Sequence, residues 1–278
     1  MGGLQYESSP DSFTSLVTDL TIKYKVYVYD NSREGLSLDN KAIYYYHDAE
    51  NGGLAKAINH CVDQALIDKV DRLVYFDQDS HLNVEFIDNL FASFAETLKK
   101  FSNLFVLGPQ PVMIDGDFYP IKLEKELENN YFTATEIITS GMVFKPALVK
   151  ELGDFDEDLF LDMIDFDICW RARAAGMVVM VDRSIKMVHE VGQGTIKTPF
   201  KILPISSPIR NYYQLRNILH LVMYKYSYSK IKIFYYLFRR TANIFINLIF
   251  ADKKLLRLKY NYLGMRDAFK KNMGKAKF

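Results

Sequence analysis

The chain has 278 residues, of which 49% are hydrophobic and 25% are charged. This composition is typical of a globular protein with one large domain or two small ones, and it excludes a low-complexity chain. Neither Cys61 nor Cys169 lies in a Cys-x-x-Cys or Cys/His cluster, so we expect a reducing cytoplasm, with no disulfide framework and no zinc site. Residues 1–6 lack a basic stretch followed by an apolar one, so no signal peptide is predicted.

The net charge of +1 conceals a strong asymmetry along the chain. Residues 225–278 contain 14 Lys and Arg against 2 Asp and Glu, a net charge of +12. The remainder contains 21 basic and 32 acidic residues, a net charge of −11. We therefore interpret the chain as an acidic body followed by a basic, aromatic region.

Strands and helices are expected to alternate in the first part of the chain. Apolar residues recur at helical spacing or in short β-type runs, and Asn51-Gly52-Gly53 marks a turn that needs a positive φ or a close approach of a ligand. Such alternation favours a parallel sheet with right-handed crossovers. The expected elements are helices over 11–22, 54–66 and 83–100, and strands over 26–29, 42–46, 73–76 and 105–107.

The pattern changes in the second part of the chain. It weakens between residues 115 and 130, which predicts a long loop of the kind that covers active sites. Beyond Pro208 the sequence becomes helical and then basic, so we expect a division near residue 205. The expected elements are strands over 137–144, 178–181 and 185–188, and helices over 146–152, 165–176, 212–226 and 230–250.

The helix predicted over 230–250 is apolar and aromatic, but Arg239 and Arg240 interrupt it. Its longest uncharged run, 241–251, falls well short of the roughly 20 residues that cross a bilayer. One interpretation is an interfacial helix with its basic residues on anionic lipid. A dimer interface is the alternative, because helices with one apolar stripe often pack against protein.

Two carboxylates follow the strand predicted over 73–76. Asp77 and Asp79 are separated by one residue, and buried strands of α/β sheets deliver functional groups at their carboxyl ends. Two hard oxygen donors near one point suit Mg²⁺ or Mn²⁺ bridging a diphosphate. An acidic turn is the alternative, because Asp and Ser are common where strands stop.

A second acidic group, Asp162, Asp165 and Asp167, lies at the start of the helix that ends at Gly176. The helix dipole favours carboxylates at this position, so a purely structural cluster is one interpretation. Clustered carboxylates also raise one another's pKa, which would make one of them a better general base. A catalytic role is therefore the other interpretation.

Several short motifs follow one another along the chain. They are Asp30-Asn31-Ser32, Asn51-x-Gly53 with Ala57 and Asn59, Phe76-Asp77-Gln78-Asp79-Ser80, Ser140-Gly141, Phe160-x-Asp162-x-x-Asp165-x-Asp167 with Arg171, His189-x-x-Gly192, and Tyr212-Tyr213-x-x-x-Arg216-Asn217. In this order they resemble the motifs of inverting family 2 glycosyltransferases of the GT-A fold, and most of all those of bacterial rhamnosyltransferases. The resemblance covers about residues 5–220.

The resemblance implies an α/β fold, with a Rossmann-like, mostly parallel sheet flanked by helices and a C-terminal helical extension. Residues 1–205 would form the nucleotide-sugar-binding catalytic domain. Residues 206–278 would form a basic, aromatic helical region for membrane association or dimerisation. One departure concerns residues 2–10, where the family usually has a long β-branched strand, so strand one is expected to be short or degenerate.

The resemblance also implies the parts of the catalytic machinery. Asp165 would be the base that inversion requires on the face opposite the leaving group, with Asp162 as a substrate-binding neighbour. Asp77, Asp79 and His189 would hold Mn²⁺ or Mg²⁺, which stabilises charge on the departing diphosphate. Apart from the resemblance, a histidine with an ordinary backbone partner is the alternative for His189.

Further residues would bind the nucleotide sugar. Asp30 would hydrogen-bond the pyrimidine ring, Asn51 and Gly53 would approach the nucleotide, and Asp77 would also contact the ribose. Local turns are the alternative for the first three. Arg216 would contact phosphate or a lipid headgroup, with an exposed helical arginine as the alternative.

The implied function is transfer of L-rhamnose from dTDP-rhamnose to a glycan or lipid-linked glycan in cell-wall or capsule polysaccharide synthesis. The protein would work in the cytoplasm as a peripheral protein on the inner face of the membrane. A homodimer formed by the helical region is the alternative role for that region. One alternative is a hexosyl- or galactofuranosyltransferase that uses a UDP-sugar. Another is a non-catalytic glycan- or nucleotide-binding module. The acidic body disfavours nucleic acid as a partner.

Overall fold

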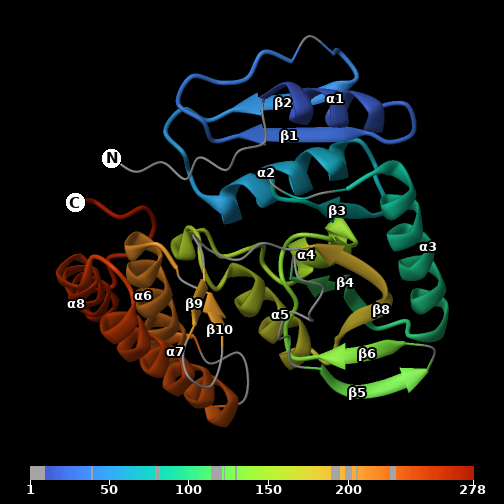
Figure 1. The fold of residues 1–278 in the computed structure, drawn as a ribbon. Helices are drawn as coiled ribbons and strands as arrows, with labels where there is room; N and C mark the ends of the chain where they lie inside the picture. The colour runs from blue at the N-terminus through green and yellow to red at the C-terminus, as the bar shows by residue number, and fades with distance from the viewer. Residues whose placement is uncertain are drawn as a thin grey trace.

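The computed structural model describes residues 10–38, 40–78, 80, 82–113, 121, 123–128, 130–188, 195–197, 202–204, 206–225 and 230–278. Strands and helices alternate in its first part, as the sequence predicts, and a mixed sheet follows (Figure 1). The elements of the first part are α1 (Pro10–Leu20), β1 (Val26–Asp30), β2 (Ile43–His47), α2 (Leu54–Ile67), β3 (Leu73–Tyr75), α3 (Val84–Lys100) and β4 (Leu104–Val112).

The second part adds the rest of the sheet and then the helical region. Its elements are β5 (Leu123–Glu128), β6 (Tyr131–Ala134), β7 (Met142–Phe144), α4 (Pro146–Glu151), the 3₁₀ turn η1 (Glu157–Leu159), α5 (Ile164–Ala174), β8 (Val178–Val188), β9 (Thr195–Lys197), β10 (Ile202–Pro204), α6 (Pro208–Tyr224), α7 (Lys230–Phe250) and α8 (Lys254–Lys270).

The central sheet has six strands in the order β3-β7-β4-β8-β6-β5, and β1 and β2 form a separate parallel pair beside it. The predicted α/β fold with a helix-flanked sheet is confirmed. The sheet is mixed rather than mostly parallel: β4 and β8 pair in parallel, whereas β3 with β7, β7 with β4, β8 with β6 and β6 with β5 pair antiparallel. Strands β3, β4, β8 and β5 run in one direction, and β7 and β6 run in the opposite direction. β7 lies between β3 and β4, and β6 lies between β8 and β5.

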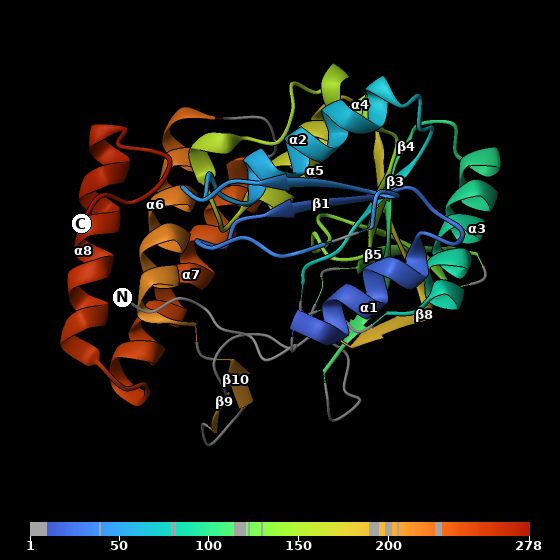
Figure 2. The same ribbon diagram turned by 90° about the horizontal axis from the view of Figure 1, so that it is seen from above.

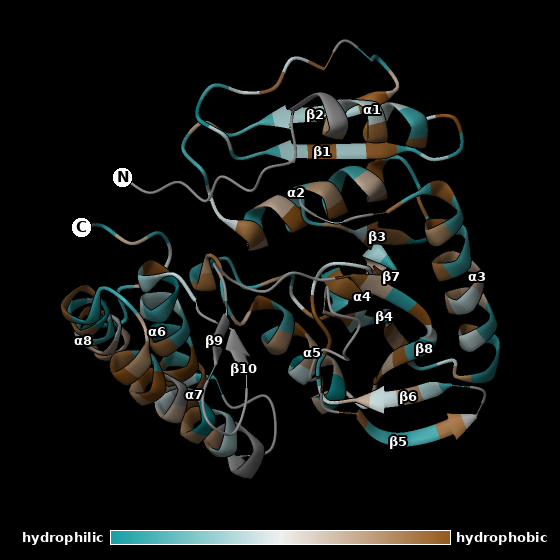
Figure 3. Cartoon of the chain, in the orientation of Figure 1, coloured by the Kyte–Doolittle hydropathy of each residue, from teal (hydrophilic) through white to brown (hydrophobic). Residues whose placement is uncertain are grey.

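Helices cover both faces of this sheet. On one face Leu90 and Phe94 of α3 pack with Leu104 and Leu107 of β4. On the other face α2, α4 and α5 pack against the sheet around a larger cluster that includes Ile168. Figure 3 shows the brown, apolar residues of these elements, while β5, a charged edge strand, is largely teal. Charge on an edge strand discourages pairing with another chain.

Helices α6, α7 and α8 gather at one end of the molecule, and α8 lies farthest from the sheet in both views (Figures 1 and 2). The predicted helical region is therefore confirmed for the residues that the structure describes. Along these residues, no helix combines the length and hydrophobicity needed to cross a bilayer.

Several predicted boundaries differ from the structure. β4 continues through Pro109 and Pro111, with an irregularity in register next to Pro109 that accommodates the missing N–H groups. β8 is one strand rather than two, because residues 183–185 bulge out of its pairing with β4 and the strand then resumes. Part of the loop predicted over 115–130 forms β5, and the predicted strand over 137–144 shortens to β7. A short or degenerate first strand is expected near the N-terminus, and residues 1–9 lie outside the described residues.

Candidate active site

The first candidate loop follows β1. Asp30 is buried at the carboxyl end of this strand, opposite His47 of β2. Its Oδ1 accepts the Ser32 N–H at 2.8 Å, and its Oδ2 accepts the Leu36 N–H and the Tyr45 hydroxyl, each at 2.8 Å. Burial by itself would raise the pKa of Asp30, but these hydrogen bonds outweigh it and lower the pKa below its ordinary value. Asp30 is therefore a fixed carboxylate at the edge where α/β sheets bind ligands.

The second candidate loop follows β2 and contains Asp48, which sequence reasoning missed. Asp48 Oδ2 accepts the Tyr29 hydroxyl at 2.6 Å, the Lys56 ammonium at 3.0 Å and the Gly52 N–H at 3.0 Å. The Tyr29 hydrogen bond is the largest cause that lowers the pKa of Asp48, and the bonds from Lys56 and Gly52 add to it. Asp48 also accepts the Glu50 N–H, the Asx-turn contact of an Asp with the residue two positions on. An Asp shortly before a Gly-Gly pair could have revealed this turn.

Gly53 begins α2 with φ of 94°, and a Cβ at this position would lie 2.6 Å from both the ring and the carbonyl oxygen of Phe160. The Leu54 N–H donates to that same carbonyl at 2.8 Å. Asn51 also has a positive φ, and its Oδ1 accepts the Gly53 N–H at 3.2 Å. Position 53 therefore requires a glycine, because its φ is positive and Phe160 lies close to it. This contact places the predicted nucleotide loop against the segment that precedes the predicted base, Asp165.

The third candidate loop follows β3, as the sequence predicts. Asp77 Oδ1 accepts the Tyr75 hydroxyl at 3.0 Å, and the Ser80 and Ser140 hydroxyls lie 2.5 Å apart beside it. Asp79 and His189, the other predicted metal ligands, lie outside the described residues. Among the residues that are described, no three His, Cys, Asp or Glu side chains come together as a metal site.

The acidic group before and within α5 has three different environments. Asp162 is buried and pairs with Arg210 at 2.8 Å. Asp167 is buried and pairs with Arg171 at 2.8 Å; burial raises the pKa of Asp167, while the Arg171 charge opposes that shift. Asp165 is the least buried of the three, and its Oδ1 accepts the N–H of the next residue at 3.0 Å. Asp165 is therefore the most exposed carboxylate of the group.

Arg216 corrects a prediction from the sequence. Its side chain is fully buried rather than exposed. It donates to the carbonyl of Gly274 at 2.6 Å, to those of Asp158 and Leu159 at 3.2 Å each, and to Asn217 Oδ1 at 2.9 Å. Because backbone carbonyls and an amide occupy its donors, Arg216 holds protein segments together rather than a phosphate or a lipid headgroup.

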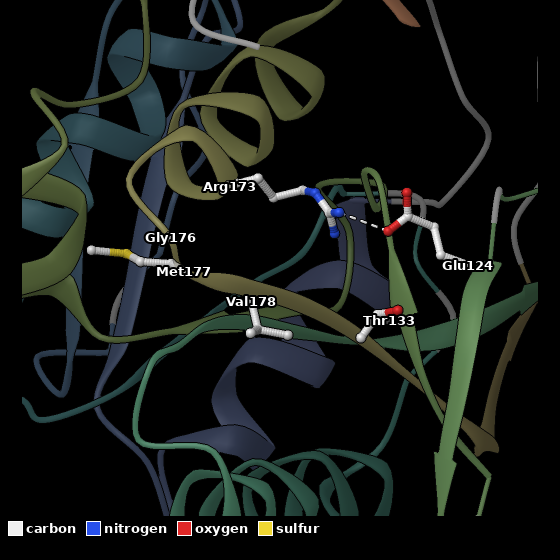
Figure 4. A pocket seen from close by; sticks show the side chains of 6 residues that line it. All are labelled: Glu124, Thr133, Arg173, Gly176, Met177 and Val178. Carbon is white, nitrogen blue, oxygen red and sulfur yellow. Dashed lines mark hydrogen bonds and ion pairs between the residues drawn. The ribbon is translucent and has the colours of Figure 1, made fainter. Parts of the chain in front are cut away.

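A pocket of about 290 Å³ lies elsewhere, beside the start of β8 (Figure 4). Arg173 points across it to Glu124, with which it forms a 2.7 Å ion pair. Strands β3 and β8 run in the same direction, so the start of β8 and the end of β3 lie at opposite edges of the sheet. This pocket is therefore distinct from the candidate active site.

Comparisons with known proteins find one similar sequence and several similar folds. No protein-family model matches the sequence. The dTDP-rhamnosyl transferase RfbF of Shigella flexneri is 29% identical over 230 residues, which cover 76% of this chain and 75% of that protein.

Solved structures show the same fold. S. aureus TarS matches with a TM-score of 0.51 and 16% identity over 83% of this chain, which spans 41% of the TarS chain. TarS 1-349 in complex with UDP matches with a TM-score of 0.50 and 16% identity over 85% of this chain and 69% of that one. The chain is thus similar in sequence to a dTDP-rhamnosyl transferase, and it shares the fold of these solved structures.

Proposed function

We propose that the chain transfers L-rhamnose, with inversion, from dTDP-rhamnose to a glycan or lipid-linked glycan during synthesis of bacterial cell-surface polysaccharide. The observation that carries this proposal is the similarity to a dTDP-rhamnosyl transferase over 230 residues. The position of Asp165 supports it, because this carboxylate is partly exposed on the first turn of α5.

In this mechanism Asp165 is the general base. Its carboxylate takes the proton of the acceptor hydroxyl while that oxygen bonds to the anomeric carbon of the donor. The bond between the anomeric carbon and the diphosphate oxygen breaks on the opposite face, and dTDP leaves with the electron pair. Asp162 would orient the sugar from its ion pair with Arg210.

The nucleotide would lie along the ends of β1 and β2. Asp30, the carboxylate fixed at the end of β1, would accept the N–H of a thymine ring. Asn51 and Gly53 would form the adjacent wall, where the backbone is already held against Phe160.

A divalent cation, Mg²⁺ or Mn²⁺, would be held by Asp77 with Asp79 and His189. The fit rests on Asp77, a hard oxygen donor at the end of β3, which is the ligand chemistry that both ions prefer. When bound, the ion would supply positive charge to the leaving diphosphate.

A donor panel tests the function. We would measure nucleoside diphosphate release from dTDP-rhamnose, UDP-glucose, UDP-galactose and UDP-galactofuranose, with metal and with chelator. We expect release from dTDP-rhamnose that chelator abolishes, and a drop of about 10²- to 10⁴-fold in Asp165→Asn, the contribution typical of a general base.

The exposed Asp71→Asn variant is the matched control and should keep wild-type activity. A preference for a UDP-sugar would discard rhamnose but keep the enzyme class. No release from any donor, together with unchanged thermal unfolding in each nucleotide, would favour a non-catalytic glycan-binding module.

We also propose that the helical region binds the inner membrane surface at anionic lipid. Exposed apolar residues recur on α8 with spacings of three and four, and exposed lysines flank them. Two acidic residues lie in α7, α8 and the turn between them. Asp252 pairs with Arg257, and Asp267 pairs with Arg266. The uncovered charge is therefore positive, which repels a second copy and attracts anionic headgroups. The apolar residues are Leu255, Leu258, Tyr262, Met265 and Phe269.

Flotation with vesicles tests this surface. The wild type should float with phosphatidylcholine vesicles that contain phosphatidylglycerol and sediment with pure phosphatidylcholine vesicles. A Leu255→Ser, Tyr262→Ser double variant should lose flotation, whereas Ile22→Ser, which removes an equally exposed apolar side chain elsewhere, should retain it. Equal flotation of all three proteins would refute the proposal, and a concentration-dependent dimer lost in the double variant would favour dimerisation.

A further inference from the structure

The chain makes an unusual turn immediately before the predicted base. Phe160 has φ of 63° and ψ of −54°, and the Leu161 N–H donates to the Leu159 carbonyl at 2.8 Å. This is a γ-turn of the positive-φ form, which is rare and strained. Met163 also has a positive φ, 72°, at the start of α5. Two strained residues therefore set the direction in which α5 begins and presents Asp165, so the surrounding structure must hold them.

Side chains of α6 hold this turn from one side. Asn217 Nδ2 donates to the carbonyls of Leu159 at 2.8 Å and Asp162 at 2.6 Å. Arg216 donates to the carbonyls of Asp158 and Leu159, each at 3.2 Å. The Tyr212-Tyr213-x-x-x-Arg216-Asn217 motif thereby acquires a role that its sequence did not indicate.

The tail segment, residues 271–278, closes the same network from the other side. The Gly274 N–H donates to the Asp158 carbonyl at 2.7 Å, and the Gly274 carbonyl accepts from Arg216 at 2.6 Å. The Ala276 N–H donates to the Tyr213 hydroxyl at 3.0 Å, and the ring of Tyr213 stacks on Phe160 with centroids 5.1 Å apart. The tail segment thus contacts the residues that hold the turn.

The tail segment also reaches the predicted nucleotide loop. The ammonium of Lys275 donates to the carbonyl of Glu50, directly before Asn51. The same loop is joined to the turn by the hydrogen bond from Leu54 to Phe160. The tail segment therefore contacts both halves of the candidate active site, the half that would bind the nucleotide and the half that carries the base.

We propose that the tail segment is required for the geometry of the active site. It fixes the Phe160–Met163 turn through Arg216, and it fixes the nucleotide loop through Lys275. Arg216 is then a positioning residue for Asp165 rather than a substrate ligand. This inference rests on the proposed function, since it assigns Asp165 and the Glu50–Gly53 loop their roles in transfer. The alternative is a passive contribution of the tail to stability.

Conservative variants separate these two roles. Tyr213→Phe removes the acceptor of the Ala276 N–H but keeps the ring that stacks on Phe160. Its matched control is Tyr260→Phe, in which a ring that packs on Phe278 loses its hydroxyl. Lys275→Ala removes the contact to the nucleotide loop, and Lys277→Ala removes an exposed lysine two positions away. Deletion of residues 271–278 removes the whole segment.

We would measure kcat, the KM for dTDP-rhamnose and the melting temperature of each variant. Displacing a catalytic group by about 1 Å can cost about 10²-fold, so we expect kcat to fall about 10- to 100-fold in the deletion and several-fold in Tyr213→Phe. Lys275→Ala should raise KM several-fold with kcat within about twofold. Both controls should match the wild type. Unchanged kcat and KM in Tyr213→Phe and Lys275→Ala would overturn the proposal, whether or not the deletion variant folds.

Hydrogen exchange provides a readout that does not depend on activity. The amides of residues 159–165 should exchange faster in Tyr213→Phe than in Tyr260→Phe, because the tail no longer holds the turn. If the wild type transfers no rhamnose, the proposed function fails, and faster exchange would still support the positioning role. Equal exchange in both variants would overturn that role.

Discussion

The two halves of the candidate active site are stabilised in opposite ways. The carboxylates of the nucleotide half are held locally: the hydrogen bonds of Asp30 and Asp48 come from residues no more than 19 positions away. The half that carries Asp165 is held by residues of α6 and the tail segment, at least 48 positions away. The carboxylates of the first half are thus held by contacts within and next to β1 and β2, whereas Asp162 and the turn before Asp165 are held by the helical region.

This difference bears on the predicted division at residue 205. The hydrogen bonds from α6 and the tail to residues 158–162 cross that division. Contacts between distant segments form late because loop closure must precede them. The catalytic half therefore depends on residues 206–278, although the sequence predicts a separate region there. Substitutions in α6 should then affect the second half of the site and leave the hydrogen bonds of Asp30 and Asp48 intact.

The largest expected effect comes from removing the long-range anchor. Arg216→Met leaves buried carbonyls without their donor, so we expect the free energy of unfolding to fall by about 3 kcal/mol in urea titrations. Arg33→Met, which removes an exposed arginine of the local half, should change it by less than about 0.5 kcal/mol. Equal losses in the two variants would mean that Arg216 contributes no more than a surface side chain.

The contact between the two halves can be tested by adding one methyl group. Gly53→Ala places a Cβ 2.6 Å from Phe160, at a φ of 94°, so we expect a loss of about 2–4 kcal/mol. Gly153→Ala has a similar φ of 86° but no atom within 4 Å of its Cβ, and strain alone should cost about 1 kcal/mol. Urea unfolding of both variants isolates the contact with Phe160. Similar losses would assign the whole effect to the backbone angle.

The difference between local and long-range contacts also explains which features could be predicted from the sequence. The position of Asp77 at a strand end and the left-handed Gly176 after α5 follow from local patterns, and both are confirmed. The burial of Arg216 could not be predicted, because its partners are backbone carbonyls far away in the chain and backbone groups leave no signature in the sequence. The mixed sheet was missed for the same reason: strand direction depends on distant pairing rather than on local periodicity.

Some local features were also missed. Asp48 forms a short-range turn with a recognisable spacing, so the sequence did contain its signal. The sequence contained no signal for the γ-turn at Phe160. Bulky residues disfavour a positive φ, and no neighbouring residue in the sequence enforces one there. The roles predicted for Asp79 and His189 stay predictions, since both lie outside the described residues.

A smaller effect should appear at Asp48, within the local half. Its folded pKa lies below the ordinary value of about 3.9, so its contribution is fully present above that pH and is lost as the pH falls further. We expect Asp48→Asn to lower the free energy of unfolding by about 1 kcal/mol at pH 7, and the gap from wild type to close below about pH 4. Urea titrations at several pH values measure this gap. A gap that persists in acid would point to lost packing instead of lost charge.

The smallest effect concerns two histidines, one in each half. The ring of His60 lies 4.1 Å from that of Tyr46 and contacts the Tyr44 hydroxyl at 3.0 Å. Burial lowers the pKa of His60; nearby Asp63 opposes this shift, and Lys56 adds to it. Burial also lowers the pKa of His220 in α6, where the Lys225 charge adds to the shift and Asp156 and Asp158 oppose it.

Because both folded pKa values lie below the unfolded value of about 6.5, the unfolded chain binds these protons first as the pH falls. Their contribution to stability is therefore present above about pH 6.5 and is lost on acidification. We expect His60→Phe, which keeps a ring against Tyr46, to lose less stability than the wild type between pH 7.5 and pH 5.5 in urea titrations. Part of the slope should remain, because His220 still titrates. An unchanged slope would mean that the tyrosines around His60 do not exclude its charged form, and that the acid sensitivity of folding belongs to the long-range half alone.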